Sequence, residues 1–214
     1  MRFNTVIFDL DGTLLNTLDD LSDSVNAILS SHGFPLRTNN EVKQFLGNGV
    51  GALMRLSVPS SCTDEEVAIY LDEFKKHYEK NMDNKTRPFD GIMEVLIDLH
   101  RFNYNMAIVS NKFDAAVKAL SKAYFCNLFP VSIGESPTVR KKPAPDSLLT
   151  AIKELGADIN STIYVGDSDV DVMTAKNAGI PSIGVTWGFR SREVLRNAGA
   201  DYLIDTPREI FTIL

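Results

Sequence analysis

Two aspartates separated by one leucine, Asp9 and Asp11, end an apolar run and are followed at once by Gly12. The run over residues 5–8 predicts a buried strand, so the two carboxylates are expected where that strand leaves its sheet. Carboxylates side by side near an apolar core repel each other and lose solvation, a cost normally met by a divalent cation or a proton. The glycine permits a tight turn whose neighbouring N–H groups can face an anion. A cation and an anion held together indicate phosphate chemistry.

Further polar residues follow other apolar runs. Ser110 and Asn111 come directly after residues 106–109, and a hydroxyl at a strand end can bind a phosphate oxygen. The alternative is that both residues only cap a turn. Lys142 precedes Pro143 on stiff backbone, where the alternative is a solvated lysine. Asp167 follows residues 163–165, and its alternative is the capping of a helix N-terminus.

The elements that must position these groups fall into two blocks. Residues 18–29 carry apolar side chains at helical spacing, Asn40 is expected to cap a short helix ending at Leu46, and a capping box at residues 63–66 opens a long helix towards Met82. From residue 87 onward helices alternate with strands. The strands are expected at residues 106–109, 131–133, 163–165, 182–185 and 202–204, and the helices near Ile92, Asp114, Ser147, Asp169, after Ser191 and at Pro207.

This alternation predicts an α/β fold with a doubly wound, parallel, Rossmann-like sheet and an inserted all-helical domain. The catalytic core is expected over residues 1–15 and 83–214, and the helical cap over residues 16–82. In such sheets ligands bind beyond the carboxyl ends of the strands, at the point where strand order reverses. Asp9 and Asp11 are expected there.

Composition excludes several classes of function. The 214 residues carry a formal net charge of −6, and their longest basic run is residues 140–142, so nucleic acid is not an expected partner. No apolar stretch reaches the roughly 18 residues that span a bilayer, and the N-terminus lacks a signal pattern, which predicts a cytoplasmic protein without a membrane partner. Cys62 and Cys126 lie in no metal or redox motif and are not site candidates.

Taken together, the polar segments are more specific than any one of them. DxDGT at residues 9–13, Ser-Asn-Lys at 110–112, Lys-Pro at 142–143 and GDSxxD at 166–171 resemble the four motifs of the haloacid dehalogenase (HAD) superfamily of phosphohydrolases. The resemblance covers the whole chain and includes a helical cap after the first motif. An acid at position 11 argues against dehalogenation, since that branch lacks it, and in favour of a phosphatase.

The resemblance implies a role for each matching residue. Asp9 would be the nucleophile that forms an aspartyl-phosphate, and Asp11 would be the general acid and base. Mg²⁺ would be held by the carboxylates of Asp9 and Asp167 and by the backbone carbonyl of Asp11, an all-oxygen set. Lys142 would supply a fixed positive charge beside the nucleophile.

Other matching positions would bind the substrate or orient these groups. Thr13, Ser110 and Asn111 are expected to bind the phosphate, with backbone amides after Asp9 and at Asn111 contributing. Asp171 is expected to orient a metal-bound water or Lys142 from outside the ligand set.

The cap is expected to select the substrate. Residues 45–51, with residues 186–191 and 198–201 of the core, look like the phosphoglycolate phosphatase branch. The glycines around Asn48 could offer N–H groups to a small carboxylate, with Arg55 as its counter-charge. The alternative is a turn and helix start that only pack inside the cap.

The predicted partner is therefore a small phosphorylated metabolite, with phosphoglycolate as the model substrate. Inorganic pyrophosphatase and sugar phosphomutase activities are alternatives on the same chemistry. A non-catalytic binding protein of this fold is the alternative of a different class. Such a protein would be expected to have lost one of the residues Asp9, Asp11, Lys142 and Asp167, and this chain has all of them. The sequence is compatible with a monomer or a dimer.

Overall fold

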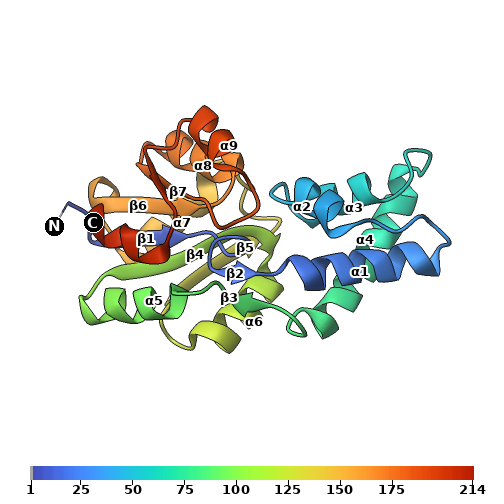
Figure 1. The fold of residues 1–214 in the computed structure, drawn as a ribbon, viewed down its shortest axis with the longest axis horizontal. Helices are drawn as coiled ribbons and strands as arrows, with labels where there is room; N and C mark the ends of the chain where they lie inside the picture. Colours follow the sequence, from blue (N-terminus) through green and yellow to red (C-terminus); the bar gives the residue numbers. More distant parts are fainter. Residues whose placement is uncertain (1) are drawn as a thin grey trace.

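The computed structural model describes residues 2–214, and its centre is a six-stranded parallel sheet (Figure 1). The strands lie in the order β5-β4-β1-β6-β7-β8. Their bounds are Thr5–Phe8 for β1, Asn105–Phe113 for β4, Val131–Glu135 for β5, Thr162–Gly166 for β6, Ser182–Val185 for β7 and Tyr202–Ile204 for β8. The chain builds β4 and β5 on one side of β1 and β6 to β8 on the other, so strand order reverses beside β1. The predicted doubly wound α/β fold is confirmed.

The two faces of the sheet carry separate hydrophobic clusters, because successive side chains of a strand point to opposite faces. Val6 and Phe8 of β1 pack with helices α5 and α6 on one face, while Ile7 packs with α7 and α8 on the other. The helices of the sheet block are α5 (Ile92–Arg101), α6 (Asp114–Phe125), α7 (Asp146–Leu155), α8 (Asp169–Ala178) and α9 (Arg192–Ala198), with short 3-10 helices η1 (Ile159–Ser161) and η2 (Pro207–Thr212).

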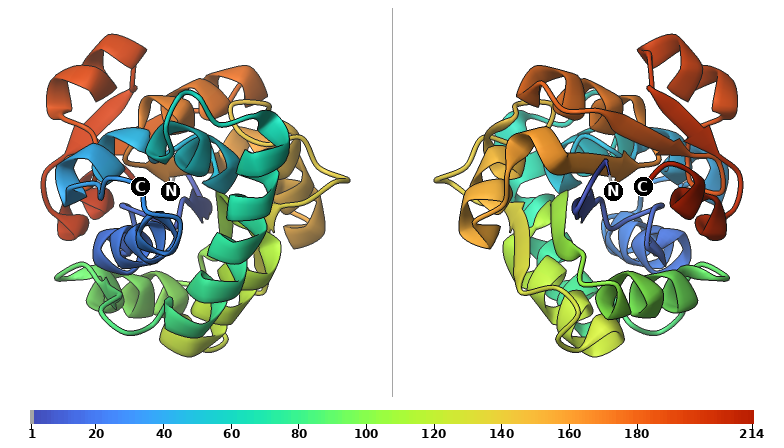
Figure 2. Two further views of the ribbon diagram at one scale, coloured as in Figure 1. Left: turned by 90° about the vertical axis from the view of Figure 1, so that its right-hand side faces the viewer. Right: turned by 90° about the vertical axis from the view of Figure 1, so that its left-hand side faces the viewer.

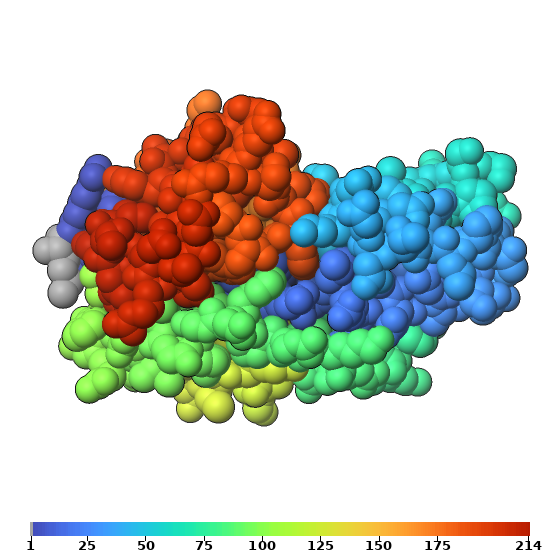
Figure 3. All heavy atoms as spheres, in the orientation of Figure 1, coloured from blue at the N-terminus to red at the C-terminus, as the bar shows by residue number. Residues whose placement is uncertain are grey.

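Four helices lie together beyond the carboxyl ends of the strands (Figures 1 and 2). They are α1 (Leu18–Ser31), α2 (Asn39–Phe45), α3 (Val50–Ser57) and α4 (Asp64–Asn81), and we call residues 18–81 the cap segment. Its buried side chains form a hydrophobic cluster of their own, which Phe113 and Ala116 of the sheet block also join. In the space-filling view the cap segment meets the C-terminal part of the sheet block (Figure 3).

Two element boundaries differ from the sequence expectation. Helix α2 is capped by Thr38 and not by Asn40, because Thr38 has Glu41 at the third helical position and the two complete a capping box. Strand β4 continues past Val109 to Phe113, with a register shift between those residues. Its polar residues 110–112 are buried in the strand because they find hydrogen-bonding partners at the site described below.

A second, two-stranded sheet joins the cap segment to the core. It pairs β2 (Leu15–Asn16) antiparallel with β3 (Arg87–Pro88), where the chain enters and leaves the cap segment. Next to it the buried carboxylate of Asp20 in α1 accepts hydrogen bonds from the backbone N–H groups of Lys85, at 2.9 and 3.0 Å, and Thr86, at 2.8 Å. One side chain of the cap segment therefore holds the returning chain. No helix within residues 2–214 is long and apolar enough to cross a membrane.

Removing this carboxylate is expected to destabilise the fold. Asp20→Ala leaves two backbone donors without their carboxylate partner, one of them in the buried residue Thr86, so we expect it to lower the free energy of unfolding by about 1–3 kcal/mol. Asp23→Ala is the matched control on the same helix, since it removes only an exposed ion pair with Lys85 and should cost about 0–1 kcal/mol. Urea unfolding of both variants measures the difference, and equal losses would contradict the role given to Asp20.

Candidate active site

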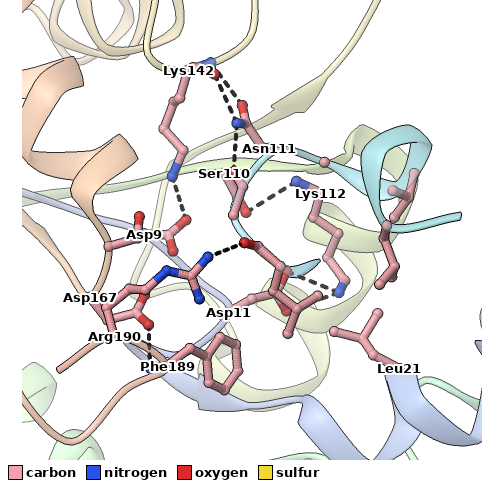
Figure 4. A pocket seen from close by; sticks show the side chains of 16 residues that line it. Asp9, Asp11, Leu21, Ser110, Asn111, Lys112, Lys142, Asp167, Phe189 and Arg190 are labelled. Carbon is pink, nitrogen blue, oxygen red and sulfur yellow. Dashed lines mark hydrogen bonds and ion pairs between the residues drawn. The ribbon is translucent and has the colours of Figure 1, made fainter. Parts of the chain in front are cut away.

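The central strands bring the motif residues to one cavity between the sheet and the cap segment (Figure 4). Asp9 follows β1, Ser110 and Asn111 lie in β4, and Asp167 follows β6. Strand β1 pairs with both β4 and β6, so the three groups meet at neighbouring strand ends. The cavity has a volume of about 50 Å³. Its walls are formed by Asp9, Asp11, Leu21, Leu46, Gly47, Gly49, Val50, Leu53, Ser110, Asn111, Lys112, Lys142, Asp167, Ser168, Phe189 and Arg190.

Lys142 is the cation at the centre of the site. Its buried ammonium donates to Asp9 Oδ1 at 2.7 Å, to Asp171 Oδ1 at 2.6 Å and to the hydroxyl of Tyr164 at 3.0 Å. The geometry excludes a solvated lysine, which was the alternative left by the sequence. Lys142 holds together two buried carboxylates, that of Asp9 after β1 and that of Asp171 in the first turn of α8.

Both carboxylate oxygens of Asp171 accept hydrogen bonds from protein groups. Its Oδ1 accepts from Lys142 and Tyr164, and its Oδ2 accepts from the backbone N–H and the hydroxyl of Ser168. Asp171 therefore contacts Lys142, as expected of an orienting residue. Gly166 makes this approach possible, because a Cβ there would lie 2.3 Å from the Asp171 Cβ.

Asp167 is held by backbone and by Thr13. Its Oδ2 accepts from the N–H of Phe189 at 2.6 Å, and its Oδ1 accepts from the hydroxyl of Thr13 at 3.2 Å. The placement of Thr13 on the phosphate was wrong, since Thr13 is fully buried, lies outside the cavity wall and orients Asp167 instead. Gly12 is required beside it, because it has φ of +87° and a Cβ there would lie 2.3 Å from Asp167 Oδ2.

Burial perturbs the ionisation of the whole cluster. It raises the pKa of Asp9 to about 7, with the charge of Asp171 adding to the rise and Lys142 opposing it. Burial, with the charges of Asp171 and Asp9, raises the pKa of Asp167 well above its usual range. Burial also disfavours the charged form of Lys142, but the charges of Asp171 and Asp9 outweigh this and raise its pKa.

The acidic residues fit a bound metal ion. One carboxylate oxygen from each of Asp9, Asp167 and Asp171 lies within 4.8 Å of the others. When all three are ionised, Lys142 neutralises one of three negative charges and two remain in a buried site. A divalent cation would balance them, and an all-oxygen donor set suits a hard cation. Each oxygen of Asp171 already accepts two hydrogen bonds, whereas each oxygen of Asp167 accepts one and Asp9 accepts one from Lys142. Asp9 and Asp167 therefore keep the lone pairs that could bind the ion.

Asp11 points to a second lysine. The ammonium of Lys112 donates to both carboxylate oxygens of Asp11, at 2.9 and 3.1 Å, and lies 4.5 Å from the ring centroid of Tyr78 in α4. Lys112 is almost completely buried, and Tyr78 of the cap segment covers it. Asp11 is thus held in place by a core lysine whose environment includes the cap segment.

Ser110 and Asn111 both line the cavity, and their predicted contact with phosphate stays a prediction. Ser110 Oγ accepts from the backbone N–H of Lys112 at 3.2 Å, which leaves the hydroxyl proton of Ser110 available to a substrate oxygen. The side chain of Asn111 is occupied differently. It accepts from the backbone N–H of Lys142 at 2.8 Å and donates to the carbonyls of Lys142 and Gly47, both at 3.0 Å.

The expectation for Arg55 was wrong. Its guanidinium donates to the carbonyls of Cys62, Pro59 and Ser60, where it holds the loop after α3, and it does not line the cavity. Asn48 also lies outside the cavity wall, and its carbonyl accepts from Lys141 at 3.3 Å. The cap segment contributes only apolar side chains and glycines to the wall, so it offers no counter-charge to a substrate anion there.

Three residues of the site carried no prediction. Lys112 stood inside the Ser-Asn-Lys segment, but nothing in the sequence indicated that it would reach back to Asp11. Phe189 binds Asp167 through its backbone, which no side-chain pattern reveals. Arg190 donates to the carbonyls of Lys43 at 2.9 Å and Leu46 at 2.6 Å, contacts that depend on how the cap segment folds over the core.

Comparisons with known proteins agree with this arrangement. The model of the haloacid dehalogenase-like hydrolase family matches residues 6–185. The phosphoglycolate phosphatase of Mesorhizobium japonicum is 33% identical over 193 residues, which cover 88% of this chain and 85% of the relative. The N-acetylmuramic acid 6-phosphate phosphatase of Pseudomonas aeruginosa is 29% identical over 216 residues, which cover 100% and 96%. A crystal structure of a candidate phosphoglycolate phosphatase from Lactobacillus delbrueckii subsp. bulgaricus has a TM-score of 0.92 at 33% identity and covers 98% and 97% of the two chains.

The chain therefore belongs to the haloacid dehalogenase-like hydrolase family. The expected class of enzyme, an HAD-type phosphatase, is confirmed. Membership in this class of enzymes argues against the alternative of a non-catalytic binding protein.

The raised pKa of Asp9 predicts how cation binding depends on pH. Below pH 7 the cation must displace a proton from Asp9, whereas above pH 7 the carboxylate is already ionised. We expect the affinity for Mg²⁺, measured by calorimetry without substrate, to be weaker at pH 6 than at pH 8 by about tenfold. Asp169→Asn is the control, because Asp169 is half-exposed and outside the cluster. If the Mg²⁺ affinity of the unmodified protein stays constant between pH 6 and pH 8, Asp9 is not a ligand whose proton the cation displaces.

Proposed function

We propose that this chain is a Mg²⁺-dependent phosphomonoester hydrolase that acts on a small phosphate ester, phosphoglycolate or a close analogue, through an aspartyl-phosphate on Asp9. The observation that carries the proposal is the buried Asp9 carboxylate, paired with Lys142 at 2.7 Å, in a cavity lined by both the core and the cap segment. The names of relatives support the same substrate class, since phosphoglycolate phosphatases recur among them.

The size of the cavity favours a small substrate. Its volume of about 50 Å³ corresponds to roughly three to five water positions at 10–15 Å³ each. A cavity of this size favours a small ester over a hexose phosphate, for which the cap segment would have to move away. The cavity therefore disfavours the sugar phosphomutase alternative and keeps pyrophosphate as the nearest competitor.

The core supplies the charges for the first chemical step. An oxygen of Asp9 attacks phosphorus, a P–O bond to Asp9 forms, and the ester P–O bond breaks. Lys142 neutralises part of the charge that would otherwise repel an anionic substrate from a carboxylate nucleophile. When bound by Asp9 and Asp167 and the Asp11 carbonyl, Mg²⁺ would supply the remaining positive charge. Lys112, which lines the cavity beside Asp11, adds to the positive charge that faces an anionic substrate.

Asp11 would move the protons of both steps. In the first step it gives a proton to the departing alkoxide, and in the second it takes a proton from the water that attacks phosphorus and frees the Asp9 carboxylate. The Lys112 ammonium, at 2.9 and 3.1 Å from its two oxygens, fixes the position of the carboxylate. Exclusion of bulk water by the cap segment protects the acyl phosphate from uncontrolled hydrolysis.

A phosphate-release screen tests the substrate class. With Mg²⁺ present, we expect phosphoglycolate to be hydrolysed with a higher kcat/KM than a hexose 6-phosphate, because the cavity admits the small ester. Pyrophosphate in the same screen decides between the two small substrates. Asp9→Asn keeps the size of the side chain but is a far weaker nucleophile, so turnover should fall to less than about a hundredth. Retention of more than about a tenth of the activity would remove Asp9 from this role.

Asp11→Asn separates proton transfer from nucleophilic attack. Phosphoglycolate leaves as a basic alkoxide and needs a proton, whereas p-nitrophenolate leaves unaided, so the first step should slow much more with phosphoglycolate. The second step needs a base with either substrate. Rapid mixing of the variant with p-nitrophenyl phosphate should therefore give one equivalent of p-nitrophenolate and then stop. Equal slowing of the first step for both esters, with no burst, would mean that Asp11 positions other groups and transfers no proton.

A further inference from the structure

The core holds the cap segment through a row of backbone carbonyls. We call residues 43–48 of the cap segment the carbonyl segment. Core side chains donate hydrogen bonds to the backbone carbonyls of five of these residues. Arg190 donates to Lys43, Gln44 and Leu46, Asn111 donates to Gly47, and Lys141 donates to Asn48. The three donors come from different parts of the core, and Figure 4 shows Asn111 and Arg190 at the edge of the cavity.

Asn111 differs from the other two donors because it also holds the catalytic lysine. Its Oδ1 accepts from the backbone N–H of Lys142 at 2.8 Å, and its Nδ2 donates to the backbone carbonyl of Lys142 at 3.0 Å. The same Nδ2 donates to Gly47 of the carbonyl segment at 3.0 Å. One buried amide thus contacts the cap and both polar groups of the Lys142 peptide backbone, whereas Arg190 and Lys141 make no side-chain hydrogen bond to Lys142 within residues 2–214.

The cap side of this contact requires glycine. Gly47 has φ of +107° and Gly49 has φ of +84°, both in the left-handed region. A Cβ on Gly49 would also lie 3.2 Å from the carbonyl oxygen of Asn111. The carbonyl segment can therefore approach β4 closely enough to meet the Asn111 amide only with its present backbone.

We propose that Asn111 is a positioning residue that couples closure of the cap segment to the placement of Lys142 beside Asp9. The inference rests on the function proposed above. When the carbonyl segment docks, Gly47 gives the Asn111 amide a second acceptor and fixes its plane, and the fixed amide then holds the Lys142 backbone in register. The Lys142 ammonium is therefore held at its hydrogen-bonding position beside Asp9 only when the cap segment is docked and excludes water.

The test compares variants that loosen the same contact but differ in their link to Lys142. Asn111→Asp keeps the shape and one acceptor, but it replaces the Nδ2 donor by an oxygen that faces two carbonyls. Gly47→Ala changes only the cap side, by straining a residue with positive φ. Arg190→Met removes donors to the carbonyl segment without touching the Lys142 backbone.

The readout is single-turnover release of p-nitrophenolate from p-nitrophenyl phosphate with enzyme in excess, which reports the first step. We expect Asn111→Asp and Gly47→Ala to lower the maximal rate by about tenfold or more. Arg190→Met should mainly raise the enzyme concentration needed for half-maximal rate, because it weakens closure but leaves Lys142 held by Asn111.

A measurement independent of activity shows whether the variants loosen the cap. Spin labels at Cys126 and at Glu65→Cys, in a Cys62→Ser background, report the distance between core and cap segment. Both Asn111→Asp and Arg190→Met should broaden the distance distribution relative to the unmodified protein. Thermal unfolding midpoints confirm that each variant is folded before its rate is interpreted.

Two results would overturn the proposal. One is a maximal rate for folded Asn111→Asp that stays within about threefold of the unmodified protein. The other is an equal fall in maximal rate for Arg190→Met, which would show that cap position alone decides the rate. Failure of the proposed function is distinguishable from either result, because the unmodified protein would then release no p-nitrophenolate or Asp9→Asn would retain its activity.

Discussion

The structure depends on a cluster of charges that are buried together and must therefore be paired. Lys142 lies between Asp9 and Asp171 with almost no solvent contact, in a setting where one unpaired charge would be strongly destabilising. The cluster is assembled from three loops at the carboxyl ends of parallel strands, so it forms only when the sheet is complete. When Asp9, Asp167 and Asp171 are all ionised, Lys142 balances one of their three negative charges. A divalent cation would balance the remaining two. The same excess that disfavours the empty site therefore favours binding of the ion.

Close packing of backbone around the acids explains the glycines of the motifs. A Cβ at Gly12, Gly166 or Gly188 would lie 2.3 Å from an atom of Asp167 or Asp171. These glycines are therefore needed to place the carboxylates at all, and only Gly12 among the three also needs its positive φ. Substituting any of them would displace an acid and leave buried charge without its partner.

The sequence predicted the parts of the site that local patterns determine. Apolar runs that end in Asp9, Ser110 and Asp167 mark strand ends, and a parallel sheet brings such ends to one edge whatever the loops between them do. Arg55 binds backbone carbonyls of the next loop, which no side-chain pattern reveals, and Thr13 binds a carboxylate 154 residues away in sequence. Lys112 and Arg190 were missed for the same reason, since their partners lie 101 and 144 to 147 residues away in sequence.

The core and the cap segment contribute different groups to the cavity wall. Every cation in the wall, Lys112, Lys142 and Arg190, comes from the core, while the cap segment contributes only apolar side chains and glycines. The cap segment therefore offers no positive charge to a substrate anion at this wall. It can limit the size of a bound molecule and exclude water, while the positive charge of the wall comes from the core alone. A substitution in the cap segment would therefore change the shape of the cavity without removing its positive charge, and a substitution of a core lysine would do the reverse.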